Sequence, residues 1–205
     1  MTQAVRWGVL SAAKIAREQV IPALQRGAHS TVDAIASRDI ARAGKAAQDF
    51  SIPKSYGSYE ELLADPDIDA VYIPLPNHLH APLTIQALEA GKHVLCEKPI
   101  ALNAAEARAV EEAQARTGRL AAEAFMVRYH PQWRRARDIV ESGRLGDVRA
   151  IQTIFAYNNV DPGNIRIDAP TQATTSIFNQ SAVPTTNTSP TTTMIGVADI
   201  KFLID

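Results

Sequence analysis

The chain has 205 residues, of which 46% are hydrophobic and 21% charged, and its formal net charge is −1. This length allows one large domain, or one domain plus part of a second, and the apolar fraction excludes disorder along the whole chain. A net charge close to zero argues against nucleic acid or a membrane surface as the main partner, because both favour a basic excess. No stretch approaches the roughly 18 apolar residues of a membrane span, and the start MTQAVRWGVL lacks the pattern of a signal peptide. The single cysteine, Cys96, cannot form an internal disulfide, which fits a cytoplasmic location.

The average composition conceals a change near residue 169. Residues 169–198 contain no charged residue, although the average would give roughly six in thirty. Residues 171–193 hold nine threonines. Residues 169–205 are therefore expected to form a Thr-rich tail of unknown structure, distinct in kind from residues 1–168.

Apolar runs and helical patterns alternate through the first 124 residues. Short apolar runs predict strands over 5–10, 31–36, 70–73, 93–96 and 119–124. Helical spacing, capping boxes at 58–61 and 103–106, and stop glycines predict helices over 14–26, 39–50, 58–63, 78–90 and 103–118. Pro22 is expected to kink or shorten the first helix. This alternation is typical of βαβ units, and it predicts an α/β fold with a mostly parallel sheet covered on both faces.

The rhythm changes after residue 124. A helix is predicted over 131–141, a longer strand with mixed alternation over 147–157, and a loop over 158–168. The sequence therefore predicts a first domain over 1–124 and the start of a second over 125–168.

Ligands of parallel sheets bind outside the carboxyl ends of the strands, so the residues after each strand are the candidates for a site. The first strand runs into GVLSAAKIA, where a dinucleotide fingerprint would show G-x-G-x-x-G/A. The three glycine positions are occupied by the small residues Ser11, Ala13 and Ala16, and Gly8 lies upstream in the strand. The alternative is an ordinary tight strand-to-helix turn.

Ser37 and Arg38 follow the second strand, with Arg42 one turn further on. An NAD-binding protein usually has an acid here for the ribose 2′-hydroxyl. A hydroxyl and a guanidinium suit a 2′-phosphate instead, since arginine binds phosphate in a fork. The pattern favours NADP over NAD, and the alternative is a solvated surface arginine.

Two further loops hold candidate residues. Residues 74–80 contain two prolines that restrict the backbone, and Asn77 is a candidate helix cap. His78 and His80 predict no metal site, because no cysteine or acid lies nearby in the sequence. After the next strand, Lys98 is placed to polarise a hydroxyl or carbonyl, and the bond to Pro99 allows a fixed cis turn. Its alternative is a surface lysine before a turn proline.

Arg128 and His130 lie beyond the last strand of the first domain. They are candidate substrate contacts, although a solvated start of a helix explains them as well. Trp133 is expected to pack, and the arginines at 134, 135 and 137 to form a solvated helix face.

Taken together, several segments of residues 4–168 resemble one protein family. They are GVLSAAKIA, SRD, YGSYEELLADPDIDAVYIPLPNHLH and AGKHVLCEKPIALNAAEA. They resemble the glucose–fructose oxidoreductase, inositol dehydrogenase and rhizopine catabolism family, Gfo/Idh/MocA. The resemblance implies an N-terminal Rossmann domain with a doubly wound parallel sheet, followed by an α+β substrate domain that is incomplete here. It also implies an NAD(P)-dependent oxidoreductase of sugars, polyols or related diols and carbonyls, and a homo-oligomer in full-length members.

The resemblance also assigns roles to single residues. Lys98 matches the lysine that contacts substrate and assists proton transfer near the nicotinamide. The positions that match cofactor contacts are Gly8, Ser11, Ala13, Lys14 and Ile15 for the phosphates, Ser37 and Arg38 for the 2′-phosphate, and Leu75, Pro76, Asn77, His80 and Glu97 along the cofactor, with Lys98 beside it.

The match stops after about residue 168. Family members continue with a glycine-rich run and a helix that carries the second acid–base residues, and neither pattern occurs here. A truncated or frame-shifted product explains the abrupt change better than divergence, and the competing explanation is a specialised short tail. A nucleotide-binding module without turnover, or a non-functional product, therefore stands beside the enzyme as an alternative.

Overall fold

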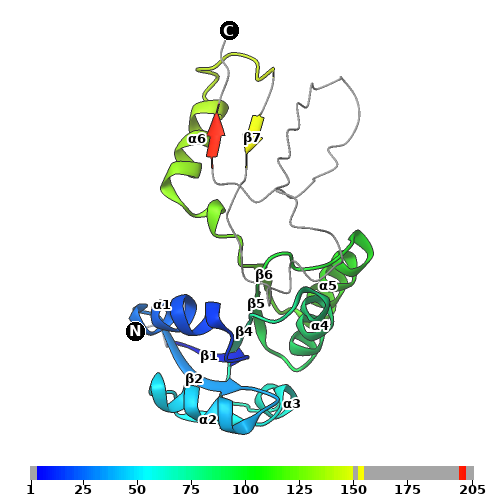
Figure 1. Ribbon diagram of the computed structural model, residues 1–205. Coiled ribbons are helices and arrows are strands. Elements are labelled where there is room, and N and C mark those ends of the chain that lie inside the picture. The colour runs from blue at the N-terminus through cyan, green and yellow to red at the C-terminus, as the bar shows by residue number, and fades with distance from the viewer. Residues whose placement is uncertain (1–3, 150–151, 155–198, 202–205) are drawn as a thin grey trace, which may run out of the picture. The chain divides into compact units, whose positions relative to one another are not determined.

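The computed structural model describes residues 4–149, 152–154 and 199–201 (Figure 1). The chain divides into two compact units, residues 1–126 and 127–205. In the described ranges, no helix combines the length and apolar character needed to cross a membrane.

The first unit is built on a six-stranded sheet. Its strands are β1 (Val5–Leu10), β2 (Ser30–Ala36), β3 (Lys54–Tyr56), β4 (Ala70–Ile73), β5 (His93–Cys96) and β6 (Ala121–Glu123). All neighbours pair in parallel, in the order β3-β2-β1-β4-β5-β6. This is the strand order of a doubly wound Rossmann sheet, so the predicted fold class is confirmed. The direction of winding reverses between β1 and β4.

Helices connect successive strands. They are α1 (Ile21–Arg26), α2 (Ile40–Asp49), α3 (Tyr59–Leu63), α4 (His80–Glu89) and α5 (Ala104–Thr117), with a π-helical turn over Ala16–Val20 and a 3₁₀ turn over Asn77–Leu79. Both predicted capping residues are confirmed: Ser58 accepts from the Glu61 amide, and Asn103 accepts from the amides of residues 105 and 106. These local signals place the helix starts.

Pro22 follows a π-helical turn within the first helix. It lies in the first turn of α1, where a missing amide proton costs little, and the wider π-helical turn precedes it. The helix predicted over 14–26 is confirmed, because residues 14–26 are helical throughout with a π-helical turn inside, and the shortening expected from Pro22 is absent.

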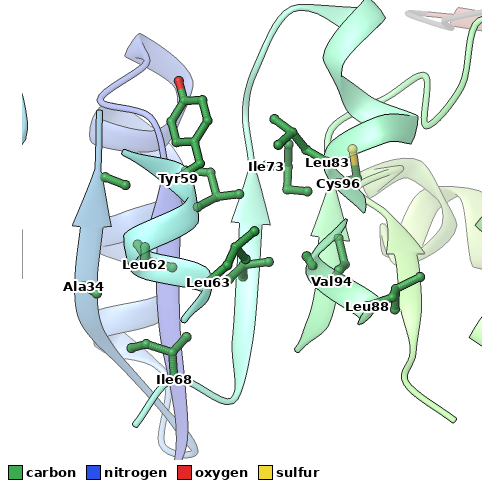
Figure 2. Close-up of a cluster of buried hydrophobic side chains, with 14 of the residues drawn as sticks. Ala34, Tyr59, Leu62, Leu63, Ile68, Ile73, Leu83, Leu88, Val94 and Cys96 are labelled. Carbon is green, nitrogen blue, oxygen red and sulfur yellow. The ribbon is translucent and has the colours of Figure 1, made fainter. Parts of the chain in front are cut away.

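Residues of β1, β2, β4 and β5 divide between two apolar layers, one on each face of the sheet. In β4, Val71 and Ile73 belong to the cluster beneath α3, α4 and α5, whereas Tyr72 points into the cluster beneath α1 and α2. Figure 2 shows the first of these layers, with Leu62 and Leu63 of α3 on one side of the sheet and Leu83 and Leu88 of α4 further along. The sheet is thus covered on both faces, as the buried strands predict.

Gly8 has a packing role in this core. A Cβ built on it would lie 2.6 Å from Cδ2 of Leu62, which is fully buried on α3. The register between β1 and β2 also shifts between Trp7 and Gly8. The glycine therefore lets α3 approach the sheet closely, whereas its predicted contact with a cofactor stays a prediction.

In the second unit, α6 (Pro131–Glu141) has the predicted bounds, and β7 (Gln152–Ile154) pairs antiparallel with β8 (Asp199–Lys201). The strand predicted over 147–157 is wrong at its start, because residues 147–149 are not in a strand. Gly146, with a φ of 64°, closes a turn just before them, and the chain extends later. Residues 155–157, the predicted loop at 158–168 and most of the tail lie outside the described residues.

Candidate nucleotide and catalytic site

The reversal of strand order between β1 and β4 sets the place of the site. In open parallel sheets, ligands bind at such a reversal, outside the carboxyl ends of the strands. The loop after β1, the segment from Pro74 to His80 after β4, and the turn after β5 all lie at this end of the sheet.

The loop after β1 keeps a glycine-like backbone at a position that is not glycine. Ser11 has a φ of 142°, a region that L-residues rarely adopt. It stands where the first loop glycine of the fingerprint would stand. The loop is tied to the following helical turn, since Nε of Arg17 donates to the carbonyl of Ala12 at 3.1 Å. Ala16, at the last fingerprint position, is completely buried against the sheet. The loop therefore has the conformation and the close packing that a pyrophosphate site requires.

The end of β2 holds a set of polar groups with distinct tasks. Ser37 is buried, and its hydroxyl accepts from the amide of Asp39 at 3.3 Å. The Asp39 carboxylate caps α2 by accepting from the amides of Ala41 and Arg42. The Asp39 carboxylate is thus hydrogen-bonded to the backbone of its own helix, whereas the side chains of Arg38 and Arg42 are exposed.

Tyr59 is a candidate site residue that the sequence did not point out. Burial raises the pKa of its hydroxyl, while the guanidinium groups of Arg38 and Arg42 act in the opposite direction, so both lie near it. Figure 2 shows the Tyr59 ring beyond Leu62 and Leu63, with its hydroxyl oxygen toward the end of the sheet where the strand arrows point. Two cations and a phenol hydroxyl therefore gather at the end of β2, a donor set that suits a phosphate. The signal available in the sequence was a tyrosine directly after a capping serine, which packing explains equally well.

The turn after β5 presents Lys98 and is held by its neighbours. The peptide bond between Lys98 and Pro99 is cis, and the Lys98 side chain is exposed. On one side of it, the Tyr72 hydroxyl donates to Glu97 at 2.7 Å. On the other, the amide of Ile100 donates to Glu123 at 3.0 Å. Side chains of β4 and β6 thus bond the residues on both sides of the lysine, Tyr72 to the Glu97 carboxylate and Glu123 to the Ile100 amide.

The segment after β4 contributes exposed and buried groups. Pro76 and Asn77 are exposed and Leu75 is partly buried. Neither the 3₁₀ turn nor α4 has a side-chain cap, so the capping role considered for Asn77 is wrong. His80 is buried, and both its ring nitrogens lie 2.6 Å from backbone carbonyl oxygens, those of Pro99 and Leu75.

Cys96 and the possible metal ligands were also candidates for chemistry at this site. Burial raises the pKa of the Cys96 thiol to about 12, so a thiolate nucleophile is not formed near neutral pH. Within the same ranges, no three His, Cys, Asp or Glu side chains gather as metal ligands. The arrangement is suited to binding a nucleotide and to presenting one lysine.

The predicted substrate contacts belong to the second unit. Arg128 lines a hollow of about 260 Å³ together with Trp133, Arg134 and Arg137. His130 caps α6, since its Nδ1 accepts from the amide of Gln132 at 3.3 Å. Of the two candidates, Arg128 therefore faces a hollow, and the imidazole of His130 has a structural contact in its own helix.

Comparison with known proteins gives a consistent result. Residues 5–125 match the family model described as an oxidoreductase family with an NAD-binding Rossmann fold. The chain is 47% identical over 163 residues to D-xylose 1-dehydrogenase (NADP(+)) 2 of Haloferax volcanii, a match that covers 79% of this chain and 50% of that protein. A 3-ketoreductase from Actinomadura kijaniata, solved with NADP and TDP-benzene, superposes with a TM-score of 0.73 at 36% identity, over 80% of this chain and 50% of the other.

A third relative is solved with the other nicotinamide cofactor. Scyllo-inositol dehydrogenase from Lactobacillus casei, with bound NAD(H) and scyllo-inositol, superposes with a TM-score of 0.67 at 25% identity, over 73% of this chain and 44% of that one. The chain spans about half the length of the curated relatives that it matches. On the family model, the strand order and these similarities, the chain belongs to the Gfo/Idh/MocA oxidoreductase family, with its NAD(P)-binding Rossmann fold.

Proposed function

We propose that this protein binds NADP in preference to NAD, and that it is an oxidoreductase of sugars, polyols or related diols and carbonyls. The observation that supports the cofactor most strongly is the gathering of Arg38, Arg42 and Tyr59 at the end of β2, with the nearby Asp39 carboxylate already used as a helix cap. A 2′-phosphate would find two cations there, and the carboxylate of Asp39 is already bonded to the amides of residues 41 and 42.

The other cofactor contacts follow from the same end of the sheet. The pyrophosphate would be held by the loop from Ser11 to Ile15, whose small residues and glycine-like backbone allow close approach. Leu75, Pro76, Asn77 and Glu97 would line the path toward Lys98. Gly8 and His80 are expected to support these contacts from below the cofactor. Gly8 packs against Leu62, and His80 is buried.

Lys98 is proposed as the catalytic residue. When bound, the nicotinamide ring supplies the hydride donor or acceptor. The Lys98 ammonium would hydrogen-bond the reacting oxygen of the substrate, and it would stabilise negative charge or give a proton as that oxygen changes between carbonyl and hydroxyl. Its exposure and the supported turn on either side make this contact sterically available.

The substrate class is proposed from the relatives, whose names refer to a xylose dehydrogenase, a dihydrodiol dehydrogenase and a scyllo-inositol dehydrogenase. In the second unit, Arg128 and His130 are the proposed substrate contacts, and the hollow beside Arg128 supports the first.

Two measurements test the proposal. NADPH and NADH are titrated against the full chain by fluorescence, and NADPH is expected to bind more tightly. Turnover is then measured over a panel of sugars and polyols with NADP, where Lys98→Ala should abolish turnover while leaving NADPH affinity within about twofold. Lys45→Ala, which removes an exposed lysine of α2 paired with Asp49, is the matched control. Absence of binding for both nucleotides would refute the proposal.

A nucleotide-binding module without turnover is the second candidate. The observation that favours it is that the family match covers residues 5–125, the part of the chain that holds the candidate nucleotide site. Tight NADPH binding without turnover on the whole panel would support this candidate over the enzyme.

A further inference from the structure

His80 is a buried titratable group that the proposed chemistry does not use. It is the first residue of α4 and is 1% exposed. Its Nδ1 lies 2.6 Å from the carbonyl oxygen of Pro99, and its Nε2 lies 2.6 Å from that of Leu75. A carbonyl oxygen can only accept, so each contact is a hydrogen bond only if that ring nitrogen carries a proton.

The two contacts bear on the charge of the ring. A neutral imidazole has one N–H, and its other nitrogen would turn a lone pair toward a carbonyl oxygen 2.6 Å away. The imidazolium supplies both donors, and charged donors form shorter hydrogen bonds than neutral ones.

No charged side chain competes with the two carbonyl oxygens for the His80 ring in the described part of the chain. In the described part of the chain, no carboxylate hydrogen-bonds His80, and the Glu97 carboxylate of the adjacent turn is engaged by Tyr72. The side chains of His78 and Lys98 are exposed. The ring is therefore bonded to backbone from two loops.

The loops of Leu75 and Pro99 are both fixed to the core, so a side chain that bonds both of them holds one at a fixed distance from the other. The side chains of Leu75 and Ile100 pack against the same core cluster, and the amide of Ile100 is held by Glu123. The carbonyl of Pro99, one residue after Lys98, lies 2.6 Å from Nδ1 of His80. We infer that His80 is a positioning residue for Lys98, which bridges the Leu75 and Pro99 carbonyls as a doubly donating imidazolium. The inference rests on the proposed role of Lys98.

The first test reads the ring directly in the wild-type protein and needs no nucleotide. The full chain is labelled with ¹⁵N-histidine, and the ring nitrogens are observed by NMR at neutral pH, with His80 assigned by the signal that a variant lacks. Both ring nitrogens of His80 are expected to carry protons protected from solvent exchange. A single unprotonated ring nitrogen would overturn the inference.

The second test separates the two bonds. The amide of asparagine reaches the place of Nδ1, and the amide of glutamine reaches that of Nε2. His80→Asn should therefore keep the bond to Pro99, whereas His80→Gln should lose it. Hydrogen exchange at the Ile100 amide is expected to be about tenfold faster in His80→Gln than in His80→Asn. The exposed neighbour provides the control His78→Gln, which should match the wild-type protein.

Function is read separately. NADPH affinity is expected to stay within about twofold in the asparagine and glutamine variants, while kcat falls more in His80→Gln than in His80→Asn. Equal exchange in the two variants would overturn the bridge, and an equal loss of NADPH affinity in both would assign His80 to nucleotide contact instead. If the wild-type protein binds no NADPH, the proposed function fails, and the NMR and exchange results still decide the bridge.

Discussion

The preference for NADP is expected to depend on Arg38. Replacing it with alanine removes one guanidinium from the end of β2 and leaves Arg42 and Tyr59 in place. A hydrogen bond to a charged group contributes about 1.5–3 kcal/mol, which corresponds to roughly 10- to 150-fold in Kd. Because Arg38 is exposed and Arg42 remains, the lower end of that range applies, and NADPH affinity should fall about tenfold. NADH lacks the 2′-phosphate, so its affinity should change by less than about twofold.

The assay is a fluorescence titration of both nucleotides at low and high salt. The loss caused by Arg38→Ala should shrink as salt rises, since screening weakens an exposed ion pair. Arg108→Ala on α5, an exposed arginine outside the candidate site, is the matched control and should leave both affinities unchanged. An equal loss for NADPH and NADH, or no loss for either, would refute the assignment of Arg38 to the 2′-phosphate.

Three further predictions concern stability, measured by chemical denaturation. Ser11→Gly relieves the strain of a φ of 142° and should stabilise the protein by about 1 kcal/mol; a less stable variant would show that the serine is not strained. Gly8→Ala should destabilise it by about 1–3 kcal/mol through the clash with α3, whereas Gly44→Ala, whose new Cβ meets nothing within 4 Å, should be neutral or stabilising; equal effects would contradict the packing argument. Burial alone would raise the pKa of Asp65, but hydrogen bonds from Lys54, Tyr56 and the amide of Asp67 lower it to about 2. Since a lowered pKa stabilises the folded state above the unfolded value, the wild-type protein should lose about 2 kcal/mol as pH falls from about 4.5 to 2, and Asp65→Asn should lack this loss.

Local signals account for the parts of the fold that the sequence predicts well. The bounds of β1, β4, β5 and α6 match their predicted ranges, because apolar runs, caps and stop glycines act within a few residues. The strand β3 was missed, since Lys54–Tyr56 is short and polar and becomes a strand through pairing with β2. The Asn77 cap was wrong because the chain forms a 3₁₀ turn there before α4 begins.

The sequence by itself determined the fold class, the family and the loops proposed to form the site, because each depends on residue order along the chain. Tertiary structure decided how those loops are held. Tyr72 reaches Glu97 from 25 residues away, Glu123 reaches Ile100 from 23, and His80 reaches Pro99 from 19. Side chains this far apart meet only once neighbouring strands have paired, so no spacing rule predicts them. The supports around Lys98, and the tyrosine beside Arg38, are therefore consequences of the folded sheet.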